Sequence, residues 1–505
     1  MRNRFQTVHA VCNFLGSLLI ILGFLLIIPL AIVCIYTEFC EGFRTLSAFL
    51  VPMSLSFVGG SILKISFRRQ NLTSLQSMIV CSLAWLVFSG IGAIPFVIGI
   101  GSSYLDGYFE TMSGFTTTGI TMITSLDTMP KSILFWRSLT QWIGGLGILT
   151  FFLALMYHGA GAHKLFSAES HKIEMPRPVP NILNTIKILW TIYGIFTFVI
   201  VLLLSCAGMS LFDSICHSFT ALSTGGFSPH DASITYYDLN GFTHYRLIEY
   251  ILILGMMMGG INFLVHYRVV KGSLKALGDN TEMRFWWGLI CLFIIVILAE
   301  TLAHTDTSLA VDKELSQFGL FETYFRKTLF QVVSILTTTG FATQDIGSAF
   351  FGQTARQLFL VMMVIGGCTG STGGGIKVLR IAVLFSVIKH QIMKFILPTK
   401  SISAVCVDGK VLDRDEALRI TGLFFAWTVL LVTGGVITAF FSGLDSYNSF
   451  SGMFSALGNI GPCYISIQEM ARLDPAVKIV YIFGMLAGRL EIIPLLILFT
   501  PRAWK

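Results

Sequence analysis

Charge is scarce in this sequence of 505 residues, because only 12% of them are Asp, Glu, Lys or Arg. An average soluble protein contains about 25% of these residues. A soluble chain of this length would form roughly three or four domains, and each would need a charged surface that this sequence lacks. Hydrophobic residues make up 54%. The composition therefore predicts an integral membrane protein with the lipid bilayer as its solvent.

Other absences narrow the class further. The chain has no acidic or basic tail, no linker rich in Pro and Ser, and no heptad array. Its net charge of +7 is spread between apolar runs, which excludes nucleic acid as a partner. The ten cysteines form no CxxC pair and no zinc spacing, so most are expected to be small buried residues. The first apolar run, 11–36, is too long for a signal-peptide core and predicts a retained helix.

Ten apolar segments are long enough to cross a bilayer as helices, for which roughly 20 residues suffice. They span residues 11–36, 43–63, 78–100, 132–157, 182–208, 247–268, 285–303, 356–388, 417–441 and 476–499. If the N-terminus is cytoplasmic, the inside segments hold 23 of the 34 Lys and Arg residues. Because cytoplasmic loops are enriched in these residues, both termini are predicted to lie in the cytoplasm.

Four of the outer loops repeat one pattern, in which a short, half-apolar stretch ends in a Thr/Gly cluster and a second span follows. The clusters are 116–119 (TTTG), 223–226 (STGG), 337–340 (TTTG) and 458–461 (GNIG). The repeat predicts an all-α polytopic membrane protein with four pseudo-symmetric units of span, re-entrant helix and span around one central pore. Its expected divisions are two extra N-terminal helices in 1–70 and repeats in 71–160, 181–270, 282–395 and 415–505.

The chemistry of these turns suits a cation path. Non-helical backbone at membrane depth is tolerated only where it is buried in protein or lines water. Each turn follows the carboxyl end of a helix, which carries partial negative charge, and glycine allows carbonyls to face one way. Four such turns can form a ring of oxygens that replaces a cation's hydration shell. The predicted filter carbonyls belong to Thr117, Thr118, Gly119, Thr224, Gly225, Gly226, Thr338, Thr339, Gly340, Asn459, Ile460 and Gly461. A single such cluster is also typical of an ordinary loop turn, and the fourth is the weakest match.

A second candidate feature lies in the last spans of the third and fourth repeats. Six of the ten residues in segment 366–375 are glycine, and this composition predicts a broken, mobile gate below the filter. They are Gly366, Gly367, Gly370, Gly373, Gly374 and Gly375. A phosphate-binding loop is the rival interpretation, but the order GxxxxGK[ST] is absent. Arg489 is a charge inside a span, so it is expected to face the ion path level with this segment; a structural ion pair is the alternative.

With the sequence GRLE at 488–491, these features resemble the Trk/Ktr/HKT superfamily of cation transporters, and within it the bacterial TrkH/TrkG potassium uptake subunits. The resemblance covers essentially the whole chain and departs at Cys463, where glycine is expected. It implies a homodimer in the bacterial inner membrane, one K⁺ pore per subunit, and a TrkA-like ring of cytosolic nucleotide-binding subunits. In that family, serine at the position of Gly119 accompanies sodium permeability, so glycine here favours potassium.

Some alternatives remain open at this point. A sodium or mixed sodium/potassium pathway would use the same scaffold, and both channel-like flow and coupled symport are compatible with the sequence. A membrane enzyme is excluded, since the turns contain no base, no set of metal ligands and no Cys/His pair. Acidic residues flank the turns outside and either concentrate cations or are ordinary solvated charges; they are Asp106, Glu110, Asp127, Asp213, Asp231, Asp238, Asp345 and Asp445.

Overall fold

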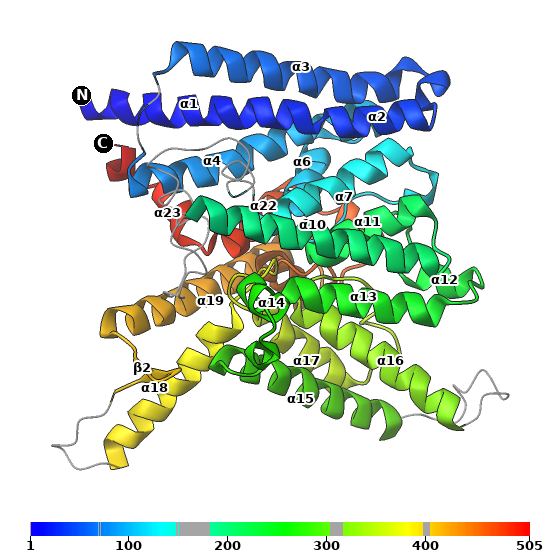
Figure 1. Ribbon diagram of the computed structural model, residues 1–505, viewed down its shortest axis with the longest axis vertical. Coiled ribbons are helices and arrows are strands. Elements are labelled where there is room, and N and C mark those ends of the chain that lie inside the picture. Colours follow the sequence, from blue (N-terminus) through cyan, green and yellow to red (C-terminus); the bar gives the residue numbers. More distant parts are fainter. Residues whose placement is uncertain are drawn as a thin grey trace.

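The computed structural model describes residues 2–68, 70, 72–147, 150, 182–303, 317–396 and 404–504. In these ranges nearly all regular structure is helical (Figure 1). The sheet found there is a single antiparallel pair, β1 (Cys406–Val407) and β2 (Lys410–Val411). The prediction of an all-α protein is therefore confirmed.

Two helical layers precede the repeats: α1 (Arg2–Leu25), which continues as α2 (Ile27–Ile35), and α3 (Phe43–Ser66). The repeats then open with α4 (Ser74–Gly92) and its continuation α5 (Ile94–Ile100), α10 (Ile182–Cys206), α15 (Thr281–Ala303) and α19 (Arg414–Ser442). The re-entrant helices are α6 (Tyr104–Phe115), α11 (Leu211–Leu222), α16 (Gln317–Leu336) and α20 (Ser446–Gly458). The second helices are α7 (Lys131–Leu146), α13 (Tyr245–Gly260), α17 (Gln353–Val364) and α22 (Pro475–Leu490).

Further helices follow the second helices or cross the loops. After the second helices come α14 (Phe263–Val270), α18 (Val378–Ile396) and α23 (Ile493–Leu498). The loops contain α12 (Thr235–Leu239), α21 (Ile467–Ala471) and the 3₁₀ turns η1 (Glu38–Glu41), η2 (Leu126–Thr128), η3 (Leu274–Leu277) and η5 (Pro501–Trp504). Both termini lie at the same end of the molecule (Figure 1).

The expectation of ten continuous spans was wrong for the second helix of each repeat. Among the described residues, six helices are long and apolar enough to cross a membrane, or seven if α13 and α14, bent by 105°, count as one span. The second helices contain only 12 to 16 residues before they break. A break was expected in the third repeat alone; the predicted segment 132–157 also extends beyond the described residues.

Close packing against the re-entrant helices accounts for these breaks. A Cβ on Gly144 would overlap the carbonyl oxygen of Phe115 at the end of α6, and one on Gly488 would overlap that of Leu457 near the end of α20. In the second repeat, a Cβ on Gly259 would lie 2.6 Å from the carbonyl oxygen of Leu222. In these three repeats the glycines therefore let the second helix touch the carboxyl end of a re-entrant helix close to the point where the second helix ends.

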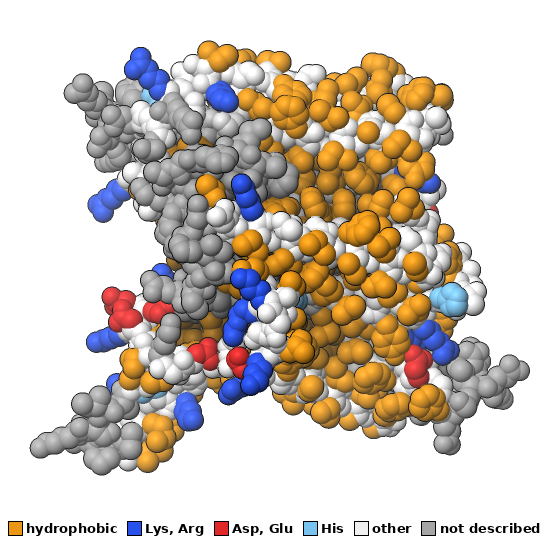
Figure 2. All heavy atoms as spheres, viewed as in Figure 1, with side chains coloured by type: hydrophobic (Ala, Val, Ile, Leu, Met, Phe, Trp, Pro, Cys, Tyr) orange, Lys and Arg blue, Asp and Glu red, His pale blue; other side chains and the backbone are white. Residues whose placement is uncertain are grey.

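The outer surface suits a membrane. On the face shown in Figure 2, hydrophobic side chains form a broad band over the helices, and most Lys and Arg side chains gather toward the end that carries both termini. On α10, for example, Ile195 is 55% exposed and Phe198 62% exposed. Exposed apolar surface on this scale is normal only where lipid or a partner covers it.

Candidate functional site

The re-entrant helices α6, α11 and α20 begin with the same cap, and the residue before α16 lies outside the described residues. The side chains of Ser103, Ser210 and Asp445 each accept a hydrogen bond from the backbone N–H three residues further along. Such a cap satisfies one of the free donors at the start of a helix. These helices then run for 12 or 13 residues, so each delivers its partly negative carboxyl end to a Thr/Gly cluster.

All four re-entrant helices also end in the same way. The second residue of each cluster has a left-handed backbone: φ is 52° at Thr117, 53° at Thr224, 59° at Thr338 and 54° at Asn459. The next N–H donates back to a carbonyl five residues earlier, as in a Schellman motif. These bonds are Thr118 N to Ser113 O (2.8 Å), Gly225 N to Thr220 O (2.9 Å), Thr339 N to Ser334 O (2.8 Å) and Ile460 N to Ser455 O (3.1 Å). The fourth cluster, the weakest match in sequence, thus has the same backbone as the others.

The fourth residue of every cluster is a glycine with positive φ: 86° at Gly119, 76° at Gly226, 89° at Gly340 and 105° at Gly461. A Cβ at each would meet the third-position carbonyl oxygen of the next cluster. These pairs are Gly119 with Gly225 O, Gly226 with Thr339 O, Gly340 with Ile460 O, and Gly461 with Thr118 O. The last pair returns to the first cluster. The four turns therefore form a closed ring in which each glycine makes room for its neighbour's carbonyl.

An open cavity of about 550 Å³ lies over this ring and is lined by all four of these glycines. Of the acidic residues that flank the turns in sequence, Asp231 and Asp345 line it. Others are engaged elsewhere, since Asp106 accepts from Lys478 at 2.6 Å. The cavity gives solvent a direct approach to one side of the ring, with two carboxylates at its wall.

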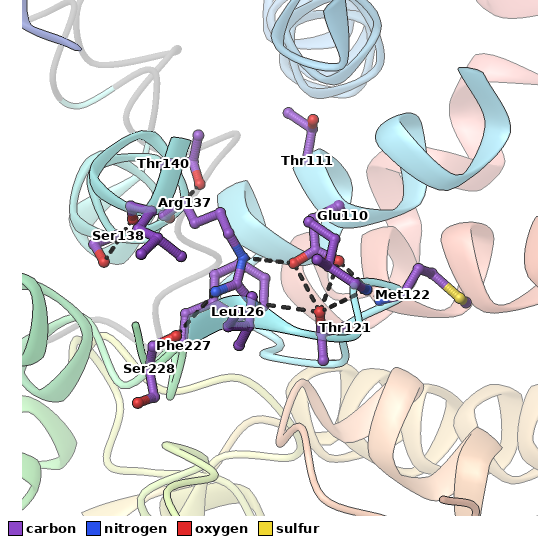
Figure 3. Close-up of polar contacts among 12 residues, drawn as sticks. Glu110, Thr111, Thr121, Met122, Leu126, Arg137, Ser138, Thr140, Phe227 and Ser228 are labelled. Atoms are coloured by element: carbon purple, nitrogen blue, oxygen red, sulfur yellow. Dashed lines mark hydrogen bonds and ion pairs between the residues drawn. The ribbon is translucent and has the colours of Figure 1, made fainter. Parts of the chain in front are cut away.

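A buried ion pair supports the first turn from outside (Figure 3). Arg137 Nε on α7 lies 2.8 Å from Glu110 Oε1 on α6, and both side chains are at most 2% exposed. The Glu110 carboxylate also accepts from Thr121 Oγ1 (3.0 Å) and from Met122 N (2.9 Å). Arg137 Nη1 donates to Ser228 O of the second repeat at 2.9 Å. One pair therefore anchors the chain just after both Gly119 and Gly226.

A histidine between two carboxylates joins the same two repeats nearer the solvent. His230 Nδ1 lies 2.6 Å from Asp127 Oδ1 and its Nε2 lies 3.5 Å from Asp213 Oδ2, while its ring stacks on Tyr236 at 3.5 Å. Burial alone would lower the pKa of His230, but the two carboxylates outweigh burial and raise that pKa above its usual value. The His230 ring therefore bridges Asp127 in the outer loop of the first repeat to Asp213 on α11.

The glycine-rich segment 366–375 lies against the other side of the ring. Gly374 N donates to Thr338 Oγ1 at 2.8 Å, and Thr372 Oγ1 donates to Leu222 O at 2.9 Å. The segment closes on itself, because Gly366 N donates to Ile376 O at 2.8 Å. Left-handed backbone occurs at Gly370 (φ 74°) and Gly375 (φ 63°). A loop rather than a helix thus sits directly under the turns.

Arg489, at the end of α22, reaches this segment. Its guanidinium donates to Thr372 O (2.5 Å), Gly144 O (2.6 Å) and Gly145 O (2.5 Å). These carbonyls belong to the glycine-rich segment and to the end of α7, so the side chain joins the fourth repeat to the third and the first. Two residues on, Glu491 pairs with Arg380 of α18 at 2.5 Å.

Sequence reasoning did not anticipate the Arg137–Glu110 pair. From the sequence alone, Glu110 is interpreted as one more acidic residue of an outer loop, and Arg137 as a charge near the end of a span. Their positions gave one usable signal. Both residues fall inside segments that must be buried, and charged residues in such segments are nearly always paired. Among the described residues, no group of three or more His, Cys, Asp and Glu side chains is arranged to hold a metal ion.

Residues 47–505 match the family described as TrkH, cation transport protein. The chain belongs to the TrkH family of cation transport proteins. It is 32% identical over 510 residues to the Trk system potassium uptake protein TrkH of Escherichia coli (strain K12), covering 98% of this chain and 99% of that protein. An uncharacterized cation transporter of Methanocaldococcus jannaschii is also 32% identical, over 506 residues, with 99% and 97% covered.

The fold of this TrkH-family chain is likewise similar to a solved structure. The crystal structure of the potassium transporter TrkH from Vibrio parahaemolyticus matches with a TM-score of 0.84 and 29% identity, over 98% of this chain and 99% of that one. The family resemblance predicted from the sequence is thus confirmed, and the architecture with it. Because the family consists of cation transport proteins, the chain is a membrane transporter and not an enzyme.

Proposed function

We propose that this protein carries K⁺ into a bacterial cell through the ring of four turns. The closed ring of glycines and carbonyls is the observation that carries the proposal. A cation gives up its water shell only where oxygens can surround it, and four turns around one axis offer oxygens from every side. The names of the relatives from Escherichia coli and Vibrio parahaemolyticus, which describe potassium transport, further support K⁺ as the ion.

The proposed filter consists of the twelve residues in positions two to four of the clusters. Gly119 completes an all-glycine set at the fourth position, which favours K⁺ over Na⁺. Transport of Na⁺, or of both ions, on the same scaffold is the alternative. Asp231 and Asp345 at the cavity wall would attract either ion, since a local negative potential raises the concentration of any cation.

The proposed gate consists of the glycine-rich segment and Arg489. The segment blocks the inner side of the ring through contacts such as Gly374 N to Thr338 Oγ1, and its glycines lower the cost of rearranging the backbone. Arg489 places a fixed positive charge beside it, which repels a passing cation. Both elements would have to move for ions to pass.

The assembly and orientation are further parts of the proposal. We infer a homodimer in the bacterial inner membrane with both termini in the cytoplasm and a TrkA-like nucleotide-binding partner beneath the pore. Helix α18 supports a partner surface at that end, because Ile388, Ile392 and Ile396, spaced one turn apart, are 56%, 55% and 69% exposed.

Purified protein in proteoliposomes tests the proposal. We expect uptake of ⁸⁶Rb⁺ against a K⁺ gradient, strong competition by K⁺ and Rb⁺, and weak competition by Na⁺ and Li⁺. Equal competition by Na⁺ would establish the mixed pathway instead. Absence of cation flux from well-folded protein, with the partner subunit added, would overturn the proposal.

A further inference from the structure

The second turn differs from the others at its third position. The residues there are Thr118, Gly225, Thr339 and Ile460. Only the second is a glycine, and its φ lies outside the left-handed region. The backbone conformation at Gly225 is therefore one that any L-residue can adopt. The conformation of the turn does not explain why this residue is glycine.

The side chain of Gln141, from α7 of the first repeat, explains it. A Cβ on Gly225 would overlap the Gln141 amide group. Gln141 Nε2 donates to Gly225 O at 2.6 Å, and its Oε1 accepts from Phe227 N at 3.0 Å. Gln141 is fully buried. Its amide thus occupies the space of the missing side chain and holds the turn on both sides of Gly226.

This contact is specific to one repeat. At the positions equivalent to Gln141, four residues before the second small residue of each pair, the other repeats have Met256, Met363 and Gly484. In the described part of the chain, no side chain donates to the carbonyl of Thr118, Thr339 or Ile460. One of the four third-position carbonyls is therefore shared between the ring and a protein donor.

We propose that Gln141 is a specificity-determining positioning residue, an inference that rests on the proposed K⁺ filter. Na⁺ and Li⁺ are smaller than K⁺, so the ring must contract for its carbonyls to coordinate them. The Gln141 amide holds the Gly225 carbonyl back and braces the next peptide through Phe227 N, which opposes that contraction. A carbonyl that already accepts one hydrogen bond is also a poorer ligand for an ion of high charge density. Both effects disfavour Na⁺ more than K⁺.

The first test replaces Gln141 with methionine, the residue of the second and third repeats. Gln141→Met keeps an unbranched side chain but cannot donate or accept these bonds. We expect the K⁺/Na⁺ permeability ratio to fall roughly threefold to tenfold, the range that one net hydrogen bond is worth, with K⁺ flux retained. Ser138→Ala is the matched control on α7, because that hydroxyl donates to Leu134 O of its own helix; its ratio should stay unchanged.

A second test exchanges the sizes of the side chains at positions 141 and 225. It distinguishes a residue that positions the Gly225 carbonyl from one that only fills space. Gly225→Thr alone should lower the amount of folded protein, because the new side chain collides with Gln141. The double variant Gln141→Ala/Gly225→Thr restores the arrangement of the first and third turns, so folding should recover while the permeability ratio stays low. Recovery of both would show that Gln141 only fills space and would overturn the inference, as would an unchanged ratio in Gln141→Met. If the parent protein itself does not prefer K⁺, the proposed function fails instead.

Discussion

Gly119 and Gly461 occupy equivalent places in the ring, yet their neighbours leave them different amounts of room. Gly119 has φ of 86° and no space for a Cβ beside Gly225 O. A non-glycine residue in left-handed backbone costs roughly 1–2 kcal/mol, before any displacement of the carbonyl. We expect Gly119→Ser to reduce K⁺/Na⁺ discrimination by about tenfold or more, as measured by bi-ionic reversal potentials.

The comparison is Gly461→Ser, since a Cβ there would lie 3.0 Å from Thr118 O. Both glycines have positive φ, so both variants carry the cost of left-handed backbone. Only the carbonyl beside Gly461 can make room by a slight shift, so discrimination should fall less than in Gly119→Ser at equal expression. A larger loss of discrimination in Gly461→Ser than in Gly119→Ser would contradict the view that Gly461 has more room for a side chain than Gly119. Unchanged selectivity in Gly119→Ser would remove Gly119 from the filter.

The Arg137–Glu110 pair should govern stability. Removing one partner leaves a charge at a site that is at most 2% exposed, and such losses cost about 3–5 kcal/mol. Arg137→Gln should therefore lower the thermal midpoint of the detergent-solubilised protein markedly. The control is Arg268→Gln, whose partner Asp279 lies 3.5 Å away with both side chains 50% exposed; pairs of this kind contribute about 0–1 kcal/mol. Equal shifts in the two variants would count against an anchoring role.

Among the elements, the glycine-rich segment is the one whose length should matter. Its contacts with Leu222 O and Thr338 Oγ1 hold it against the ring. Deleting residues 370–373 would remove the first of these contacts and shorten the loop. We expect ⁸⁶Rb⁺ uptake to rise several-fold and to depend less on the proposed cytosolic partner, because local openings of weakly held backbone cost little free energy. A shortened protein that conducts no better than its parent would make the segment purely structural.

The elements also show where sequence reasoning succeeds and where it stops. The first helix of each repeat was predicted within a few residues of its observed bounds, because its apolar run and its helix coincide; α15 was expected over 285–303 and spans Thr281–Ala303. The second helices were predicted too long because hydropathy continues past the point where Gly144 or Gly488 meets a carbonyl of another helix. That stop is a tertiary contact, so no local pattern encodes it.

At the scale of the whole molecule, the repeat pattern predicted four copies of one unit, but not how they interlock. The partner of Gly225 is Gln141 and the partner of Glu110 is Arg137, and both partners lie on one face of α7, one turn apart. Their equivalents in the other repeats are not charged or amide residues: Leu252 and Met256 in the second, Phe359 and Met363 in the third. The brace at this place on the second helix is thus particular to the first repeat, although ion pairs elsewhere join the other repeats: Glu249 on α13 pairs with Arg326 on α16, and Asp106 on α6 pairs with Lys478 on α22.

Arg489 also joins repeats, and its prediction concerns the molecule as a whole. The side chain extends from the fourth repeat to carbonyls of the first (Gly144, Gly145) and third (Thr372). Five donors on a planar guanidinium allow this bridging. Loss of the side chain should both remove a cation-repelling charge and release the glycine-rich segment. We expect Arg489→Gln to increase ⁸⁶Rb⁺ uptake into proteoliposomes several-fold.

Arg489→Lys supplies the matched comparison, because lysine keeps the charge but presents a single ammonium that cannot span the three carbonyls at once. Its uptake should lie between those of the parent and of Arg489→Gln. If charge alone forms the barrier, the lysine variant will equal the parent; if bridging alone does, it will equal the glutamine variant. Normal or reduced uptake by a well-folded Arg489→Gln protein would remove the barrier role and leave Arg489 as a structural link between repeats.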